Sequence, residues 1–146
     1  MSRINIVKPS LTFDEISPRL EKIINSGIYS NGTNINEFSS EISKLTKAKY
    51  CFPTSSATTA LWTCLKILKI REGDEVLVSD FSYPATVNVI EDLGAKPIFV
   101  DVSLEDFNMK PEELEKKISP NAKAVIFVDA LGNPSGINKI RQICNN

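Results

Sequence analysis

The sequence predicts an α/β protein with three layers, in which helices cover both faces of a mainly parallel sheet. The first observation is an alternation after residue 50, where short apolar runs typical of buried strands alternate with longer stretches typical of helices. The second observation is that glycine or proline marks most ends of these predicted strands and helices, as at Gly73, Pro84 and Gly94. Successive parallel strands need right-handed helical crossovers, which place the helices on the faces of the sheet.

The first third of the chain has a helical pattern, and we interpret residues 1–50 as an N-terminal arm followed by helices. Thr12 can cap a helix over residues 13–26, and Gly27 is a suitable stop for it. A turn-rich loop follows, and a second apolar stripe predicts a helix over residues 34–47. Residues 51–146 make up the second part of the chain.

The elements of this second part can be placed by their apolar pattern and their turn residues. We predict one strand that begins at Cys51 and further strands over residues 75–79, 97–102 and 122–129. We predict helices over residues 57–70, 84–93 and 110–118, and a last helix that begins near Ile137 after a tight loop at residues 132–136. Ligands bind beyond the carboxyl ends of parallel strands, so the candidate site loops are residues 54–59, 80–83 and 129–136.

Composition excludes several classes of function. The net charge is -1 and no Lys/Arg cluster occurs, which argues against nucleic acid as a partner. The chain has no histidine, so histidine-based catalysis and histidine metal sites are excluded, and we expect no metal. Cys51, Cys64 and Cys144 are far apart and odd in number, which favours a reducing cytosol and a cytoplasmic protein. The N-terminus has no apolar leader pattern and no run approaches a membrane span, so we expect no membrane association.

The stretch from Cys51 to Ile70 has the features of an anion site. Ser55 or Ser56 is a good N-cap for the helix, and the small Ala57 would let a ligand approach its first turn. No acidic residue occurs from Cys51 through Arg71, so the positive end of the helix dipole is not neutralised. An ordinary core helix with a Ser/Thr cap is the alternative interpretation.

The ligand can be narrowed by what the chain lacks. No Gly-Lys pair occurs, as a nucleoside triphosphate loop would need, and no G-x-G-x-x-G dinucleotide motif occurs. A small phosphate on the first loop, beside an aromatic ring from Phe81 or Tyr83 on the second loop, fits pyridoxal phosphate. Packing of Tyr83 between helix and sheet is the alternative for that residue.

Six segments, in order, resemble the DegT/DnrJ/EryC1/StrS family of sugar aminotransferases, which are fold-type-I enzymes that depend on pyridoxal phosphate. They are SGIYSNG at residues 26–32, SSATTAL at 55–61, GDEV at 73–76, FSYPATVN at 81–88, GAKPIFVDV at 94–102 and LGNP at 131–134. The resemblance covers the N-terminal portion of the family's enzymes. It implies that residues 51–146 are the first part of a truncated, pyridoxal-phosphate-binding large domain.

By position, the resemblance implies that Ala57, Thr58 and Thr59 hold the cofactor phosphate and that Tyr83 stacks on the pyridine ring. Thr59 replaces the family's usual alanine, so its backbone rather than its side chain is the expected contact. The resemblance also implies that Tyr29 and Gly32 border the sugar site.

Two aspartates are given no chemistry. Asp129 stands where many members of the family have histidine, and we expect it to cap the turn that follows. Asp101 is expected to fix a turn.

The family's Schiff-base lysine and its pyridine-nitrogen aspartate both come later than the motif at Gly132. No lysine of this chain stands in a matching motif, so we assign no catalytic residue here. We expect the 146-residue chain to be inactive by itself.

The resemblance implies an aminotransferase that acts on a nucleotide-linked keto-sugar, in the biosynthesis of cell-surface polysaccharides or deoxyamino sugars. It further implies glutamate as the amino donor, pyridoxal or pyridoxamine 5'-phosphate as cofactor, and a homodimer. Two alternatives stay open at this point: a sugar dehydratase of the same family, and a non-catalytic binding or interaction fragment.

Overall fold

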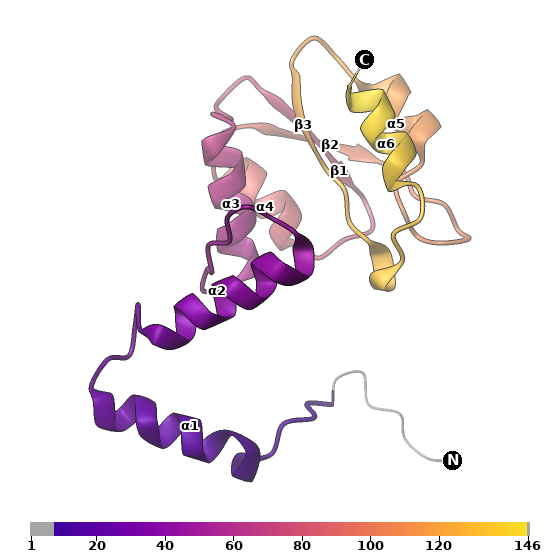
Figure 1. The fold of residues 1–146 in the computed structure, drawn as a ribbon. Helices are drawn as coiled ribbons and strands as arrows, with labels where there is room; N and C mark the ends of the chain where they lie inside the picture. The colour runs from indigo at the N-terminus through magenta and orange to yellow at the C-terminus, as the bar shows by residue number, and fades with distance from the viewer. Residues whose placement is uncertain (1–7, 146) are drawn as a thin grey trace. The chain divides into compact units, whose positions relative to one another are not determined.

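A computed structural model describes residues 8–145 of the chain (Figure 1). These residues form two compact units, 8–53 and 54–145, and each is described by itself below. Along the chain, the boundary between the units lies three residues after the boundary expected from the sequence. The functional division into an arm with helices and the start of a cofactor-binding domain stays a prediction.

The first unit contains two helices, α1 (Phe13–Ser26) and α2 (Thr33–Thr46). Both lie within about a residue of the predicted helices. The backbone N–H of Thr12 donates to Glu15 Oε2 at 2.8 Å, which holds the start of α1. Gly27 ends α1 in the left-handed region (φ 67°), as its position predicts. No residue of either helix is fully buried, and of their apolar residues only Ile23 and Ile42 are half-buried.

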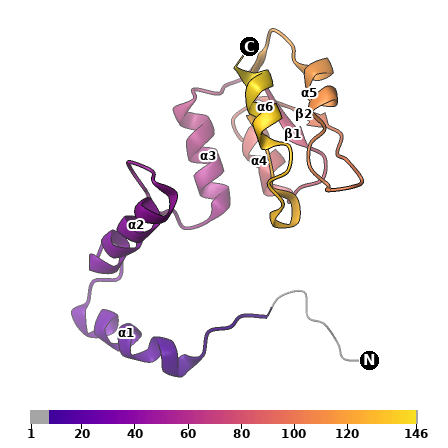
Figure 2. The ribbon, with the colours of Figure 1, turned by 45° about the vertical axis from the view of Figure 1, so that its right-hand side comes forward.

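The second unit alternates helices and strands along the chain. In order, it contains α3 (Ala57–Ile67), β1 (Glu75–Ser79), α4 (Ala85–Glu91), β2 (Lys96–Val100), α5 (Pro111–Lys117), β3 (Ala122–Ile126), a 3-10 turn η1 (Ala130–Gly132) and α6 (Ile137–Cys144). The three strands form one parallel sheet in the order β2-β1-β3. Figure 1 shows α3 and α4 on one side of this sheet and α5 and α6 on the other, and the turned view in Figure 2 brings α6 to the front.

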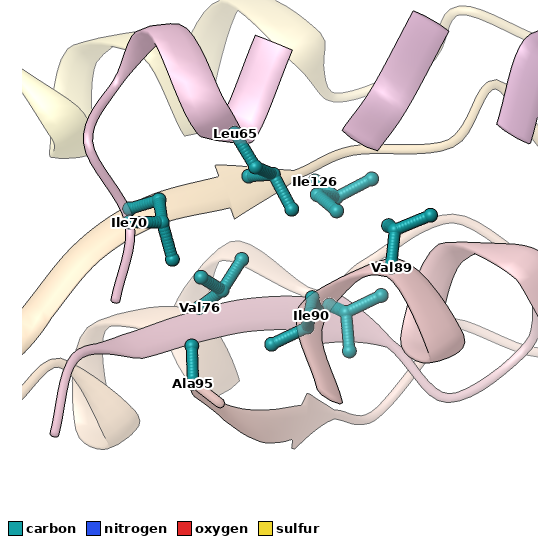
Figure 3. Close-up of a cluster of buried hydrophobic side chains, with 8 residues drawn as sticks. Leu65, Ile70, Val76, Val89, Ile90, Ala95 and Ile126 are labelled. Atoms are coloured by element: carbon teal, nitrogen blue, oxygen red, sulfur yellow. The ribbon is translucent and has the colours of Figure 1, made fainter. Parts of the chain in front are cut away.

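The core of the second unit has two halves, one on each face of the sheet. Side chains alternate along β1, so Val76 and Val78 pack with Leu65 and Ile90 from α3 and α4. Figure 3 shows Val76 in this cluster with Leu65 and Ile90. Leu77 points to the other face and packs with buried residues of α5 and α6. The predicted fold class, an α/β protein with three layers and a parallel sheet, is therefore confirmed.

The prediction of a strand at Cys51 is wrong. Residues 51–54 have no strand structure, and the Phe52 side chain is 82% exposed. A strand is defined by hydrogen bonds to a neighbour, and within residues 8–145 no strand lies beside this segment. The strand predicted over residues 122–129 also ends three residues early, at Ile126, since the chain turns into η1 soon after the sheet ends.

The two outer strands of the sheet differ at their free edges. On β2, Lys117 Nζ donates to the carbonyl oxygen of Phe99 at 2.6 Å and so occupies a backbone acceptor. On β3, no strand among the described residues covers the outer edge. Apolar hollows of about 250 and 230 Å³ flank β3, one toward Ile143 of α6 and one toward Leu61 of α3. In the described part of the chain, no helix combines the length and the apolar character needed to cross a membrane.

Candidate cofactor site at the carboxyl edge of the sheet

The start of α3 is fixed by hydroxyl groups. Ser56 is the N-cap, and its Oγ accepts a hydrogen bond from the backbone N–H of Thr59 at 3.1 Å. Thr54 Oγ1 in turn donates to the carbonyl oxygen of Ser56 at 2.9 Å, which holds the approach to the helix. Of the two serines predicted as possible caps, the structure therefore selects Ser56.

The first turn of α3 leaves hydrogen-bond donors free. Within residues 8–145, no acceptor is bound to the backbone N–H of Ala57 or Thr58, nor to the hydroxyl of Thr58. The first turn has no acidic residue, so the positive end of the helix dipole faces solvent without a carboxylate. An anion could take up these donors.

Thr59 has a different environment from its two neighbours. Its N–H is bound by Ser56, and its hydroxyl lies 3.0 Å from Ser56 Oγ and 3.4 Å from Ser55 Oγ. The side chain of Thr59 therefore belongs to the cap. Of the residues expected to hold a phosphate, Ala57 and Thr58 offer the free donors.

Tyr83 lies in the loop that follows β1 and leads into α4. Its carbonyl oxygen accepts from the N–H and from Oγ1 of Thr86, at 3.0 and 2.8 Å, so its backbone is held. Its side chain is 79% exposed, which is not the packing between helix and sheet that was the alternative for this residue. Phe81 instead packs on Phe107, with 5.1 Å between the ring centroids. Tyr83 is thus the more exposed ring of this loop, since Phe81 is 46% exposed and rests on Phe107.

No sequence pattern pointed to Phe107 or Asn108, which belong to the loop after β2. Phe107 has a left-handed backbone (φ 59°) and contributes the ring that packs on Phe81. Asn108 is 3% exposed and bonds to the loop after β3. An Asn in a polar turn is usually a local turn former, and its distant partners cannot be found from the pattern of one sequence.

The two aspartates have structural contacts. Asp101 accepts hydrogen bonds from Lys110 Nζ at 2.7 Å and from the backbone N–H of Val102 at 2.9 Å. These bonds, the one from Lys110 first, lower the pKa of Asp101 and fix the turn, as expected. Asp129 closes the turn at η1 through its backbone carbonyl, which accepts from the N–H of Gly132, and its side chain makes no cap, contrary to expectation.

Tyr29 and Gly32 belong to the first unit. The Tyr29 side chain is 74% exposed, and Gly32 is the N-cap of α2. Gly32 lines a hollow of about 450 Å³ with the basic side chains of Arg19 and Lys22. The sugar-site role of Tyr29 and Gly32 stays a prediction.

The fold and the loops together define a class: a parallel α/β domain whose carboxyl edge presents free N–H donors at a helix N-terminus and an exposed aromatic ring. The sequence model of the DegT/DnrJ/EryC1/StrS aminotransferase family matches residues 12–146, and the chain belongs to this family.

Two curated enzymes are similar to this chain. GDP-perosamine synthase of Vibrio cholerae is 34% identical over 143 residues, which are 97% of this chain and 39% of that protein. A UDP-2-acetamido-2-deoxy-3-oxo-D-glucuronate aminotransferase of Pseudomonas aeruginosa is 32% identical over 132 residues, which are 90% of this chain and 37% of that protein. The chain therefore spans about two-fifths of the length of these relatives.

A solved structure is also similar. A Streptococcus pneumoniae protein described as a sugar aminotransferase superposes with a TM-score of 0.90 at 30% identity, in its PMP form and in its PLP form. The match covers 97% of this chain and 36% of that protein. The neighbours of this fold thus include proteins solved with pyridoxal and pyridoxamine phosphate.

Proposed function

We propose that the chain is the N-terminal part of a pyridoxal-phosphate-dependent aminotransferase that acts on a nucleotide-linked keto-sugar, with glutamate as amino donor. The pathway class would be the biosynthesis of cell-surface polysaccharides or deoxyamino sugars. Membership of the family supports the reaction class, and two curated relatives are named for nucleotide sugars. The observation that carries the proposal for this chain is the first turn of α3 at the carboxyl edge of the sheet, which has no acidic residue and leaves the backbone N–H groups of Ala57 and Thr58 free.

The residues present fit the cofactor. The backbone N–H groups of Ala57 and Thr58 and the hydroxyl of Thr58 would hold its phosphate, because all of these donors are free and exposed. The exposed ring of Tyr83 would lie against the pyridine ring and restrict its orientation. When bound, the cofactor supplies the electron sink through which an amino group is moved between carbon atoms.

Thr59 would act indirectly. Its hydroxyl and N–H hold the Ser56 cap, which keeps the first turn of α3 formed and its free donors pointing outward. In the other unit, Tyr29 and Gly32 would border the sugar. The enzyme would act as a homodimer.

The 146-residue chain by itself would bind the cofactor weakly and would not turn over, since none of its lysines stands in the motif of the family's cofactor-linking lysine. A helix N-terminus contributes about 0.3–2 kcal/mol to holding an anion. We therefore expect affinities nearer millimolar than micromolar. Mixing the chain with glutamate and cofactor should give a half-reaction no faster than free cofactor does.

The test is a titration of the chain with inorganic phosphate and with pyridoxamine phosphate, followed by backbone amide NMR. Shifts should centre on Ala57 and Thr58. Thr58→Asp places a carboxylate at this position and should abolish them while α3 stays folded, because Asp is tolerated at a helix start.

The matched control is Thr33→Asp, which makes the same change of charge in the first turn of α2. It should leave the phosphate shifts at Ala57 and Thr58 in place. If both variants weaken binding equally, or if the shifts of the wild-type chain lie elsewhere, the hydroxyl cluster is only a helix cap and the proposal fails.

A further inference from the structure

The side chain of Asn108 joins two loops that are distant in sequence. It lies after β2, is 3% exposed, and makes three hydrogen bonds to the loop after β3. Its Nδ2 donates to the carbonyl oxygens of Asn133 and Ser135 at 2.8 and 2.9 Å, and its Oδ1 accepts from the N–H of Ala130 at 2.9 Å. We propose that Asn108 is the positioning residue that fixes the loop of residues 130–135 at the border of the cofactor site, an inference that rests on the proposed function.

The chemistry of these contacts requires a carboxamide. Two of the three partners are carbonyl oxygens, which can only accept, and the third is an N–H, which can only donate. Asn offers two donors and one acceptor on a short stem, and only one orientation of its amide satisfies all three partners. An Asp at this position would set a carboxylate against two carbonyl oxygens.

The loop needs such an external support because its own backbone is unfavourable. Leu131 has a left-handed backbone (φ 53°), a conformation that is unfavourable for a residue with a Cβ. Its side chain is 86% exposed, so packing contributes little to holding it there. The next residue, Gly132, is also left-handed (φ 81°). A conformation of this kind persists when surrounding contacts determine it, and Asn108 supplies three.

Asn108 is itself held in place. Its N–H donates to Asp106 Oδ1 at 3.0 Å, and its carbonyl accepts from the N–H of Ser103 at 2.9 Å. The preceding residue, Phe107, packs on Phe81 in the loop after β1. One short segment therefore ties together the loops that follow all three strands.

This arrangement links Asn108 to the proposed cofactor site. Tyr83 lies two residues after Phe81, and the loop of residues 130–135 follows β3, the strand beside β1. Neighbouring strands are about 4.8 Å apart, so the loops after β1 and β3 leave the sheet side by side. Asn108 would thus position the loop of residues 130–135 beside the pyridine ring of the cofactor, whereas Ala57 and Thr58 would hold its phosphate.

The first experiment measures amide exchange without any ligand. In Asn108→Asp, the amides of residues 130–135 should exchange about tenfold faster or more, while the amides of β1 keep their wild-type rates. Asn138→Asp, the same change at an exposed position in α6, should leave the loop unchanged. Unchanged loop exchange in Asn108→Asp would overturn the proposal, and so would an equal acceleration throughout β1.

A second measurement does not depend on a folded variant. In the wild-type chain, the Nδ2 protons of Asn108 should exchange more slowly than those of the exposed Asn138. Equal rates would show that the carbonyls of Asn133 and Ser135 do not hold this amide, and the proposal would be wrong.

The third experiment separates positioning from simple stability. On titration with pyridoxamine phosphate, Asn108→Asp should keep the shifts at Ala57 and Thr58 and lose those in residues 130–135. Loss of both sets, or of neither, would contradict the positioning role. Inorganic phosphate on the wild-type chain tests the proposed site independently, because absence of shifts there would refute the site while the exchange data still decide on the loop.

Discussion

Ser56 and Thr58 lie two positions apart at the start of α3 but have different contacts. Ser56 Oγ accepts from the N–H of Thr59, whereas the hydroxyl and the backbone N–H of Thr58 have no acceptor within residues 8–145. We expect Ser56→Ala to lower the free energy of unfolding by about 0.5–2 kcal/mol, because the cap is lost. Thr58→Ala should leave this free energy nearly unchanged and weaken phosphate binding. Urea denaturation and phosphate titration of both variants check the separation, and a loss of stability of the same size in Thr58→Ala would contradict it.

Asp101 and Lys110 form an ion pair whose effect on pH dependence can be stated. The hydrogen bond from Lys110 is the main cause that lowers the pKa of Asp101. The ionised carboxylate therefore stabilises the fold at pH values above the ordinary aspartate pKa of about 3.9, and this contribution is lost as the pH falls through the lowered pKa. Lys110→Met should raise the pKa of Asp101, as measured by NMR titration of its carboxyl carbon. Lys116→Met, which removes a lysine that pairs with Glu113 instead, should not.

At the scale of residues, local chemistry was predictable and distant partners were not. The cap of α3 and the stop of α1 at Gly27 follow from residue types within a few positions, because their contacts are local. The contacts of Asn108 reach 22 to 27 residues along the chain, and nothing near it in sequence specifies them. The same holds for the pair of Phe81 and Phe107.

Among the residues of α3, Leu65 is the one that is buried, and Leu61 packs beside it partly buried. Leu65 is 3% exposed and packs in the core, whereas Leu68 is 60% exposed. Leu65→Ala should therefore lower the free energy of unfolding by about 2–5 kcal/mol, since it leaves a cavity. Leu68→Ala should change it by no more than about 0.5 kcal/mol. Thermal or urea denaturation of the two variants distinguishes them, and equal losses would contradict the difference in burial between Leu65 and Leu68.

The helices and strands of the second unit could be predicted to within a few residues where glycine and proline mark their ends. Pro111 opens α5 and Gly94 separates α4 from β2, and both were readable from the sequence. The strand predicted at Cys51 failed because an apolar run only becomes a strand beside another strand. That requirement concerns the partner, which the run itself does not contain.

The chain should self-associate, because much of its apolar surface is uncovered. No residue of α1 or α2 is buried within the described unit, and the outer edge of β3 has no partner strand within residues 8–145. We expect dimers or larger species whose fraction grows with concentration. Light scattering after size-exclusion chromatography measures this. A monodisperse monomer at high protein concentration would contradict the expectation.

The difference between the two outer strands determines at which edge of the sheet a further strand can be added. A strand that approached β2 would first have to displace the ammonium group of Lys117 from the Phe99 carbonyl. A strand that approached β3 would meet an open backbone edge with an apolar hollow on either side. Since α6 leaves β3 on the same face as α5, the right-handed crossover rule places any parallel strand that follows α6 on that open side. In the second unit, the edge of the sheet at β2 is therefore blocked, and the edge at β3 can accept a further parallel strand.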